Sequence, residues 1–230
     1  MSVEAEILRG REENSSNVPR RMRAAAIDRF GGPEVLKPHQ LSVPKVEADE
    51  VLIKLDTAGV GSWDAEMRAG WYPGGVPEFP LVLGTDGSGS VAATGSQVSR
   101  LRLGEAVYSY SFANLRGGFY AEYVAVTADR VAPVPKGLTM REAGAIPTTG
   151  LTALQGIDNV LQVRPGEFVA VVGASGGVGT LAVQFAKLRK ARVLGFASGD
   201  DGVALVRMLG AGEGDLAASR HARQLLRRAA

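Results

Sequence analysis

The clearest chemical pattern in the sequence is a glycine loop, in which Gly173, Gly176 and Gly179 recur at G-x-x-G-x-x-G spacing. A dinucleotide pyrophosphate binds backbone N–H groups at a helix N-terminus, where unpaired donors and the helix dipole favour an anion. Glycine allows a sharp turn out of the preceding strand, and a small residue lets helix and strand approach closely. The predicted cofactor-binding residues of this loop are Gly173, Ala174, Ser175, Gly176, Gly177, Val178 and Gly179.

The flanks of the loop decide between this interpretation and a plain glycine turn without a ligand. An uninterrupted apolar run, residues 168–172, precedes the loop, and an amphipathic helix over 181–189 follows it. This strand–loop–helix context is the one that a dinucleotide site requires. No Lys-Ser or Lys-Thr pair follows the glycines, which disfavours a Walker-type phosphate loop.

The end of the next strand bears on the choice of cofactor. An acidic residue there would hold the ribose hydroxyls of NAD. This chain instead has Ser198, with Asp200 and Asp201 further on. A hydroxyl without a carboxylate favours a 2′-phosphate, so we predict NADP (NADPH) with Ser198 beside it. The two aspartates would oppose this if they faced the phosphate.

The elements around the loop predict an α/β domain. Strand 168–172 is expected to be buried on both faces, as in a central parallel strand. A second strand over 192–197 and a helix over 202–209 continue a β-α-β-α order, the front half of a doubly wound parallel sheet. Upstream, Thr139 and Glu142 form a predicted capping box, and a helix is expected over 152–160.

The first part of the chain has a different sequence pattern, in which short apolar strands are separated by Gly, Pro and Ser turns. This pattern predicts an all-β or barrel-like domain that begins near Met22. The polar residues before it are expected to form a disordered leader without a secretory signal. The predicted strands are 24–28, 51–55, 81–83, 89–93, 106–110 and 120–126.

Composition excludes several classes of protein. Among 230 residues there is no cysteine, so disulfides, thiolate metal sites and a cysteine nucleophile are impossible. A net charge of +2 gives no argument for nucleic acid. No apolar run is long enough to span a membrane, and we expect a cytoplasmic protein with no membrane partner.

Five further stretches between Met22 and Gly210 carry a family resemblance: residues 58–64, 80–89, 117–123, 143–153 and 183–187. From these segments the chain resembles the zinc-independent, quinone oxidoreductase-like branch of the medium-chain dehydrogenase/reductases. The resemblance implies a GroES-like catalytic β-domain over 22–145, after the leader 1–21, and a Rossmann domain over 146–230. It also implies hydride transfer from NADPH to a small carbonyl, enal, enone or quinone.

The resemblance places three candidate catalytic residues, Trp63, Asp64 and Tyr72, at or beside the substrate site. Tyr72 is either a hydrogen-bond donor to a substrate oxygen or part of an aromatic loop packed on the domain. Asp64 is either a base or a structural residue, and the structural role is favoured. Thr149, with Thr148, is implied near the nicotinamide, and helix capping is the alternative for this pair.

Metal binding is not expected. Zinc-using relatives have Cys where this chain has Gly61, and a His-Glu pair where it has Thr85 and Asp86. A catalytic zinc needs about three such ligands, and only Asp86 could serve. The two histidines, His39 and His221, are expected to be solvated surface residues.

The C-terminal region departs from the family pattern. Only 63 residues remain from Phe168 onward, room for about two βα units of the roughly six strands in a dinucleotide fold. We therefore expect a C-terminally truncated member with an incomplete Rossmann domain and weakened hydride transfer. The alternatives are a non-catalytic nucleotide-binding protein and a scaffold remnant, and a homodimer stays open.

Overall fold

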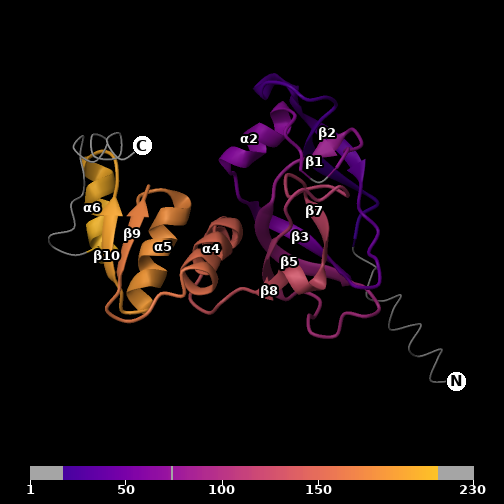
Figure 1. Cartoon of the computed structure of the whole chain (residues 1–230). Coiled ribbons are helices and arrows are strands. Elements are labelled where there is room, and N and C mark those ends of the chain that lie inside the picture. Colours follow the sequence, from indigo (N-terminus) through magenta and orange to yellow (C-terminus); the bar gives the residue numbers. More distant parts are fainter. Residues whose placement is uncertain (1–17, 74, 212–230) are drawn as a thin grey trace, which may run out of the picture. The chain divides into compact units, whose positions relative to one another are not determined.

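The chain is described by a computed structural model over residues 18–73 and 75–211. It divides into two compact units, 1–148 and 149–230, and the helix α4 contains the division. Figure 1 gives the labels of the elements. Most of the predicted leader, the tail after residue 211 and His221 lie outside the described residues.

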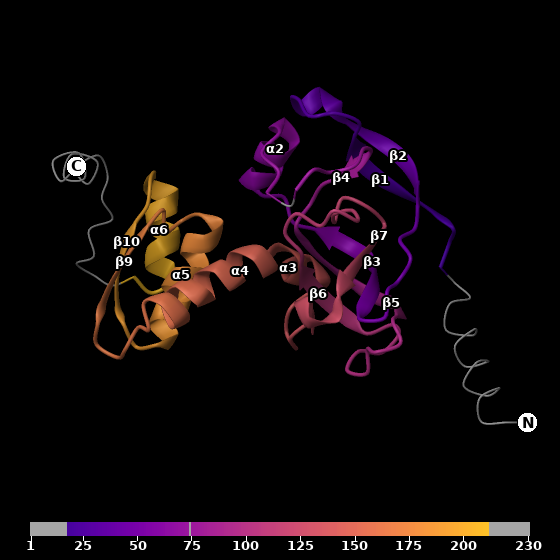
Figure 2. The same ribbon diagram turned by 45° about the vertical axis from the view of Figure 1, so that its right-hand side comes forward.

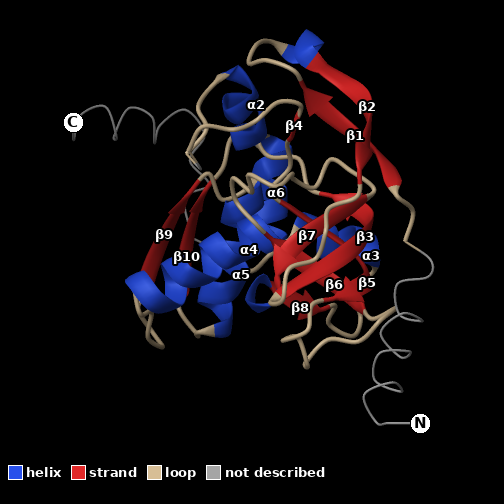
Figure 3. Cartoon of the chain, turned by 90° about the vertical axis from the view of Figure 1, so that its right-hand side faces the viewer, coloured by secondary structure: helices blue, strands red, loops and turns tan. Residues whose placement is uncertain are grey.

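The first unit is built mainly from antiparallel strands, as its turn-rich sequence predicts. Five strands pair in the order β7-β3-β5-β6-β8, and three pair in the order β2-β1-β4. Figures 2 and 3 show the pairing of β1 with β2 and the five-stranded sheet. The strands are β1 (Arg21–Ile27), β2 (Leu36–Ser42), β3 (Glu50–Ala58), β4 (Leu81–Val82), β5 (Asp86–Thr94), β6 (Ala106–Tyr110), β7 (Tyr123–Thr127) and β8 (Val131–Pro133).

Helical segments of this unit carry or support the candidate site. Two single 3₁₀ turns, η1 (Pro33–Val35) and η2 (Ala128–Arg130), adjoin strands. The helix α2 (Ser62–Ala69) follows β3, and α3 (Met140–Ala145) packs on the five-stranded sheet. Alternating apolar residues of the sheet, among them Val51 and Ile53, form a buried cluster.

The capping box predicted at the start of α3 is confirmed. The Glu142 N–H donates to Thr139 Oγ1 at 3.2 Å, and the Thr139 N–H donates to Glu142 Oε2 at 2.8 Å. The next helix differs from the prediction, because α4 (Pro147–Leu154) begins at a proline before residue 152. It continues as a π-helical segment, η3 (Gln155–Val160). Proline suits a first helical turn because it needs no N–H acceptor there.

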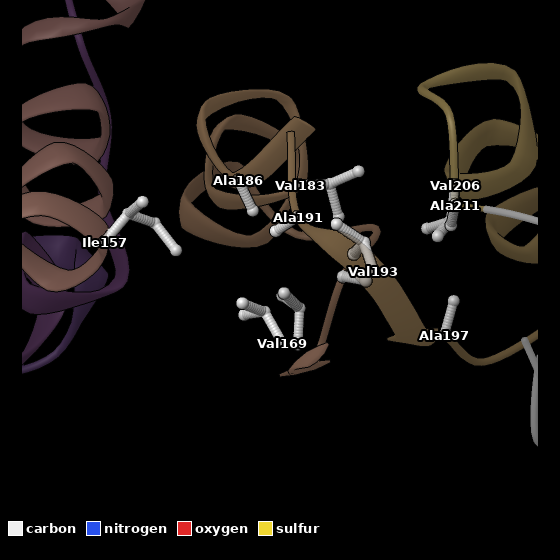
Figure 4. Packing of buried hydrophobic residues seen from close by; sticks show 11 residues of the cluster. Ile157, Val169, Val183, Ala186, Ala191, Val193, Ala197, Val206 and Ala211 are labelled. Carbon is white, nitrogen blue, oxygen red and sulfur yellow. The ribbon is translucent and has the colours of Figure 1, made fainter. Parts of the chain in front are cut away.

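The second unit has the predicted β-α-β-α order. Strands β9 (Phe168–Val172) and β10 (Arg192–Phe196) pair in parallel, with Phe168 opposite Arg192. The helices α5 (Gly177–Leu188) and α6 (Asp200–Met208) complete it. One apolar cluster joins both strands to both helices through Val169, Val183, Val193 and Val206, and Figure 4 shows this packing.

The prediction that residues 168–172 are buried on both faces is wrong for the described structure. Val169 and Val171 are 7% and 8% exposed, whereas Phe168 and Val172 are 68% and 69% exposed. Within the described residues both helices cover the same face, and β9 has one neighbouring strand. The Arg192 guanidinium lies 4.0 Å from the centroid of the Phe168 ring on the open face.

None of the helices in the described part of the chain combines the length and the apolar character that crossing a bilayer requires.

Candidate functional site

In the first unit, the start of α2 holds two of the three predicted catalytic residues. Asp64 is 4% exposed, and its Oδ2 accepts hydrogen bonds from the Gly61 N–H at 2.8 Å and the Tyr120 hydroxyl at 3.0 Å. Gly61 has no side chain to cap the helix, so the Asp64 carboxylate bonds back to its N–H. Asp64 therefore fixes the start of α2 and the Tyr120 ring.

The Asp64 carboxyl is not fully satisfied by these bonds. Its Oδ1 atom is buried and has no hydrogen-bond partner among the described residues. Burial raises the pKa of Asp64, and the hydrogen bonds from Gly61 and Tyr120 act in the opposite direction. Burial, and then the neighbouring Asp64 charge, raise the pKa of the Tyr120 hydroxyl, so that this group stays a donor.

A second set of hydrogen bonds begins at Trp63. Its indole Nε1–H donates to Thr85 Oγ1 at 2.8 Å, and Thr85 Oγ1 lies 3.4 Å from Thr148 Oγ1. An indole N–H can only donate, so Thr85 must accept from it and has its own proton left to give. Either hydroxyl of the Thr85–Thr148 pair could be the donor.

The row of polar groups ends at Asp86, the first residue of β5. The Thr148 N–H donates to Asp86 Oδ2 at 2.8 Å, and Asp86 is 3% exposed. Burial raises the pKa of Asp86; hydrogen bonds from the Thr148 side chain and backbone lower it, and the charge of Asp64 raises it. Trp63, Thr85, Thr148 and Asp86 are thus linked by hydrogen bonds, and we call these four residues the hydroxyl chain.

The third predicted catalytic residue, Tyr72, lies apart from these hydrogen bonds. Its ring is partly buried in an apolar cluster with Trp63 and Phe112, and burial raises the pKa of its hydroxyl. Among the described residues this hydroxyl makes no hydrogen bond. The adjacent Trp71 is 56% exposed, with its ring centroid 6.3 Å from that of Phe112. The Tyr72 ring therefore packs in the apolar cluster, and its hydroxyl is a hydrogen-bond donor without an acceptor among the described residues.

The space beside Gly61 is filled by an aromatic ring. A Cβ built at Gly61 would lie 2.6 Å from Trp63 Cδ2 and would overlap other atoms of the indole.

Residues 18–73 and 75–211 contain no group of three or more His, Asp or Glu side chains that could hold a metal ion. His39 is not a solvated surface residue: its side chain is 21% exposed, with Nε2 3.5 Å from Asp28 Oδ2.

In the second unit, the glycine loop joins β9 to the N-terminus of α5. The Gly176 N–H bonds to Gly173 O and the Thr180 N–H to Gly176 O, but the N–H groups of 177–179 make no backbone hydrogen bond within the described residues. Gly173 has φ +69°, and no atom lies within 4 Å of a Cβ built there. This arrangement offers open space and unpaired donors, and it fits a pyrophosphate.

The buried side of the loop explains the last glycine. A Cβ at Gly179 would lie 2.7 Å from Ala174 Cα, so only glycine allows α5 to pack this closely on the loop. Thr149 lies against the helix start, because a Cβ at Gly177 would be 3.1 Å from Thr149 Cγ2. Ser175 lies against the other helix, 3.0 Å from a Cβ built at Gly202.

Ser198 is exposed in the turn between β10 and α6. Asp200 and Asp201 occupy the first turn of α6, where the helix dipole favours acidic groups. A Cβ at Gly199 would lie 2.6 Å from Asp201 Oδ1, so this carboxylate folds back toward the turn that holds Ser198.

Sequence reasoning did not predict functional roles for Thr85, Asp86 and Tyr120. Thr85 and Asp86 were considered only as replacements for metal ligands, and Tyr120 only as part of a matching segment. The sequence offers only the position of Thr85 and Asp86 soon after the apolar run Leu81–Leu83, and the structure shows that they are 1% and 3% exposed. Polar groups that are buried this deeply require partners.

Comparison with known proteins adds evidence on ancestry. Residues 47–136 match the alcohol dehydrogenase GroES-like domain. The chain is 37% identical to a quinone oxidoreductase of Mus musculus over 193 residues, which cover 84% of this chain and 57% of the mouse protein.

Solved structures agree with this relationship. One titled as an NAD-dependent alcohol dehydrogenase has 38% identity and a TM-score of 0.78, covering 84% of this chain and 62% of that chain. A mycobacterial protein solved with NADPH has 33% identity and a TM-score of 0.73, covering 83% of this chain and 56% of that chain. The chain thus spans less than two thirds of the length of each of these relatives.

Proposed function

We propose that this chain, which belongs to the quinone oxidoreductase-like medium-chain dehydrogenases/reductases and has a GroES-like domain and two βα units of a Rossmann domain among its described residues, is an NAD(P)H-dependent reductase. The substrate class is a small quinone, enal or enone. The observation that carries the proposal is the start of α5, where unpaired N–H groups face open space beside Gly173.

The residues that would hold the dinucleotide come from the second unit. The N–H groups of Gly177, Val178 and Gly179 would bind the pyrophosphate, because donors at a helix N-terminus favour anions. Ser175 and Thr149 line the same loop and helix start. When bound, the nicotinamide supplies the hydride for the reduction.

NADPH is the favoured form of the cofactor. Ser198 is a small exposed hydroxyl residue at the position where NAD-specific sites place a carboxylate. The mycobacterial relative solved with NADPH supports this choice. Asp201 opposes the preference for NADPH, because its carboxylate folds back toward Gly199 and would repel a 2′-phosphate beside Ser198.

The substrate-side residues would come from the first unit. Reduction of a carbonyl or quinone builds negative charge on oxygen, and positioned hydrogen-bond donors stabilise that charge. The Tyr72 hydroxyl is an unused donor within the described residues. Trp63 is fixed by its bond to Thr85, and Asp64 fixes the helix start that carries Trp63.

A charge-reversal variant tests the cofactor site without disturbing the fold. Val178 is 36% exposed on the first turn of α5, so Val178→Glu places a carboxylate where the pyrophosphate would bind. An acidic residue there favours the helix dipole and keeps the helix stable. The matched control Val178→Gln has the same shape without the charge.

Isothermal titration with NADPH and NADH, followed by a turnover assay with a quinone, gives the readout. We expect Val178→Glu to weaken NADPH binding about tenfold or more, from charge repulsion worth at least about 1.4 kcal/mol, and Val178→Gln to bind nearly as the wild type does. Binding without turnover would favour the non-catalytic nucleotide-binding alternative. Equal binding by both variants would refute this assignment of the loop.

A further inference from the structure

Tyr120 is a residue to which the cofactor and substrate contacts proposed above give no role. It lies in the segment 117–123, and its hydroxyl donates to Asp64 Oδ2 at 3.0 Å. Asp64 belongs to the first turn of α2, and the same turn carries Trp63. The Tyr120 hydroxyl therefore ties a segment far along the chain to the start of the helix that holds a candidate catalytic residue.

Backbone contacts hold the Tyr120 ring in place. The Tyr120 N–H donates to Leu83 O at 2.9 Å. The Phe119 N–H donates to Gly84 O at 3.1 Å. Gly84 has φ +96°, and a Cβ built there would lie 2.7 Å from Tyr120 Cδ1 and 2.9 Å from Tyr120 N. Glycine at position 84 thus lets the ring lie directly on the chain, and the hydroxyl reaches Asp64 from a fixed base.

The same stretch of chain also holds the Trp63 indole. Thr85, a member of the hydroxyl chain, directly follows Gly84 and accepts the indole N–H at 2.8 Å. Thr85 is 1% exposed, so this acceptor is itself fixed by its surroundings. Trp63 therefore has two supports that start from neighbouring residues. Thr85 holds the indole, and Tyr120 holds the helix start through Asp64.

The Asp64 carboxyl depends on the Tyr120 hydroxyl. Asp64 is 4% exposed, and its Oδ2 accepts from the Gly61 N–H at 2.8 Å as well as from Tyr120. Both hydrogen bonds lower the pKa of the carboxyl, against the effect of burial. A buried polar group that loses a partner is destabilised unless it moves to recover one. Gly61 has no side chain that could cap α2 in place of Asp64, so the first turn would move with the carboxyl.

We propose that Tyr120 is a positioning residue for Trp63, because its bond to Asp64 sets the first turn of α2 and thereby the place of the indole. This inference rests on the proposed function, in which Trp63 is a substrate-side residue. The indole packs on the backbone of that turn, since a Cβ at Gly61 would lie 2.6 Å from Trp63 Cδ2. A displaced turn would therefore displace the indole as well.

The first experiment detects the place of the indole without any turnover. The full chain has two tryptophans, so ¹⁵N labelling gives two indole N–H signals by NMR, and Trp71→Phe assigns the one from Trp63. We expect Tyr120→Phe to shift the Trp63 signal much more than the Trp71 signal. Tyr123→Phe is the matched control, because it removes the hydroxyl of a tyrosine that is 7% exposed and packs in a different apolar cluster. An unchanged Trp63 signal in Tyr120→Phe, or an equal shift of both signals, overturns the proposal.

Two changes at Asp64 test the same link from its other end. Asp64→Ala removes the acceptor and should shift the Trp63 signal as Tyr120→Phe does. Asp64→Asn keeps an oxygen that can accept from the Tyr120 hydroxyl, so we expect a smaller shift. Equal shifts in Asp64→Ala and Asp64→Asn would show that this hydrogen bond does not set the place of the indole.

The second experiment is a double-mutant cycle in the NADPH–quinone assay. We expect Tyr120→Phe to lower kcat/KM about tenfold, because a misplaced group beside the substrate slows the reaction. The same change made in a Trp63→Phe chain should have almost no further effect, since Tyr120 acts through Trp63 and effects of coupled residues do not add. Independent, additive effects of the two changes would overturn the positioning role.

The outcomes separate the two levels of proposal. The NMR signals depend on contacts within the first unit, so they test the link between Tyr120 and Trp63 whether or not the chain reduces a quinone. A wild-type chain whose Trp63 signal responds to Tyr120→Phe but which never oxidises NADPH overturns the proposed reductase function alone.

Discussion

The Trp63 indole lies over Gly61 so closely that a Cβ at position 61 would stand 2.6 Å from Trp63 Cδ2 and overlap further ring atoms. The same indole donates to Thr85 Oγ1 at 2.8 Å. A side chain at position 61 and the observed hydrogen bond of Trp63 are therefore mutually exclusive.

Gly61→Ala is expected to destabilise the chain by about 1–3 kcal/mol, because the methyl group forces the indole out of place. Urea unfolding followed by circular dichroism measures the change. Gly156→Ala is the control, since no atom lies within 4 Å of a Cβ built there. Equal stability of Gly61→Ala and Gly156→Ala would contradict the packing described for Trp63.

Asp86→Asn is expected to change how stability depends on pH. Burial holds the folded-state pKa of Asp86 above its ordinary value of 3.8. Below that value both folded and unfolded chains carry the proton. As pH rises from there to the folded pKa, the unfolded chain ionises first, so this group progressively lowers the free energy of unfolding.

The asparagine variant lacks this ionisation. The free energy of unfolding of Asp86→Asn relative to wild type should therefore increase as pH rises above about 3.8 and level off above the folded pKa. Urea denaturation at a series of pH values provides the two curves. Curves that stay parallel across this range would show that Asp86 ionises normally in the folded chain.

Thr139→Ala removes the capping box of α3. We expect a loss of about 0.5–2 kcal/mol in the free energy of unfolding, because the Glu142 N–H loses its acceptor. Thr139→Ser keeps the acceptor and should recover most of it, and denaturant unfolding of the three chains is the measurement. An alanine variant as stable as the serine variant would argue against the cap.

Asp201→Asn tests the choice between the two nucleotide forms. Removal of a carboxylate close to Gly199 is expected to strengthen NADPH binding about fivefold through reduced repulsion of the 2′-phosphate, with little effect on NADH. Asp129→Asn, in the first turn of η2, is the matched control. Titration calorimetry with both nucleotides measures the ratio, and an unchanged ratio would place the 2′-phosphate away from Asp201.

Much of the fold follows from local patterns in the sequence. The strand 106–110 was predicted with the bounds that β6 has, and the parallel pair β9 and β10 was predicted from two apolar runs around a helix. These runs are informative because apolar and β-branched residues cluster in them. The glycine loop was identifiable for a similar reason, since its spacing and its flanks are contiguous.

Other elements give weak local signals. β2 reads Leu-Lys-Pro-His-Gln-Leu-Ser, contains a proline and is largely exposed, so its pairing with β1 is decided by tertiary contacts. α2 is short and mostly polar, and no helix was predicted there. Thr85 and Thr148 are 63 positions apart, as Asp64 and Tyr120 are 56 apart, so neither contact has a local signature.

The chain contains two tryptophans: Trp63 is itself a candidate catalytic residue, and Trp71 is the neighbour of another, Tyr72. The tryptophan fluorescence of the protein therefore originates from this region. Trp63 is hydrogen-bonded and partly buried, whereas Trp71 is 56% exposed. Single replacement of either by phenylalanine would separate the two emissions, and the protein would then carry its own optical reporter of substrate binding.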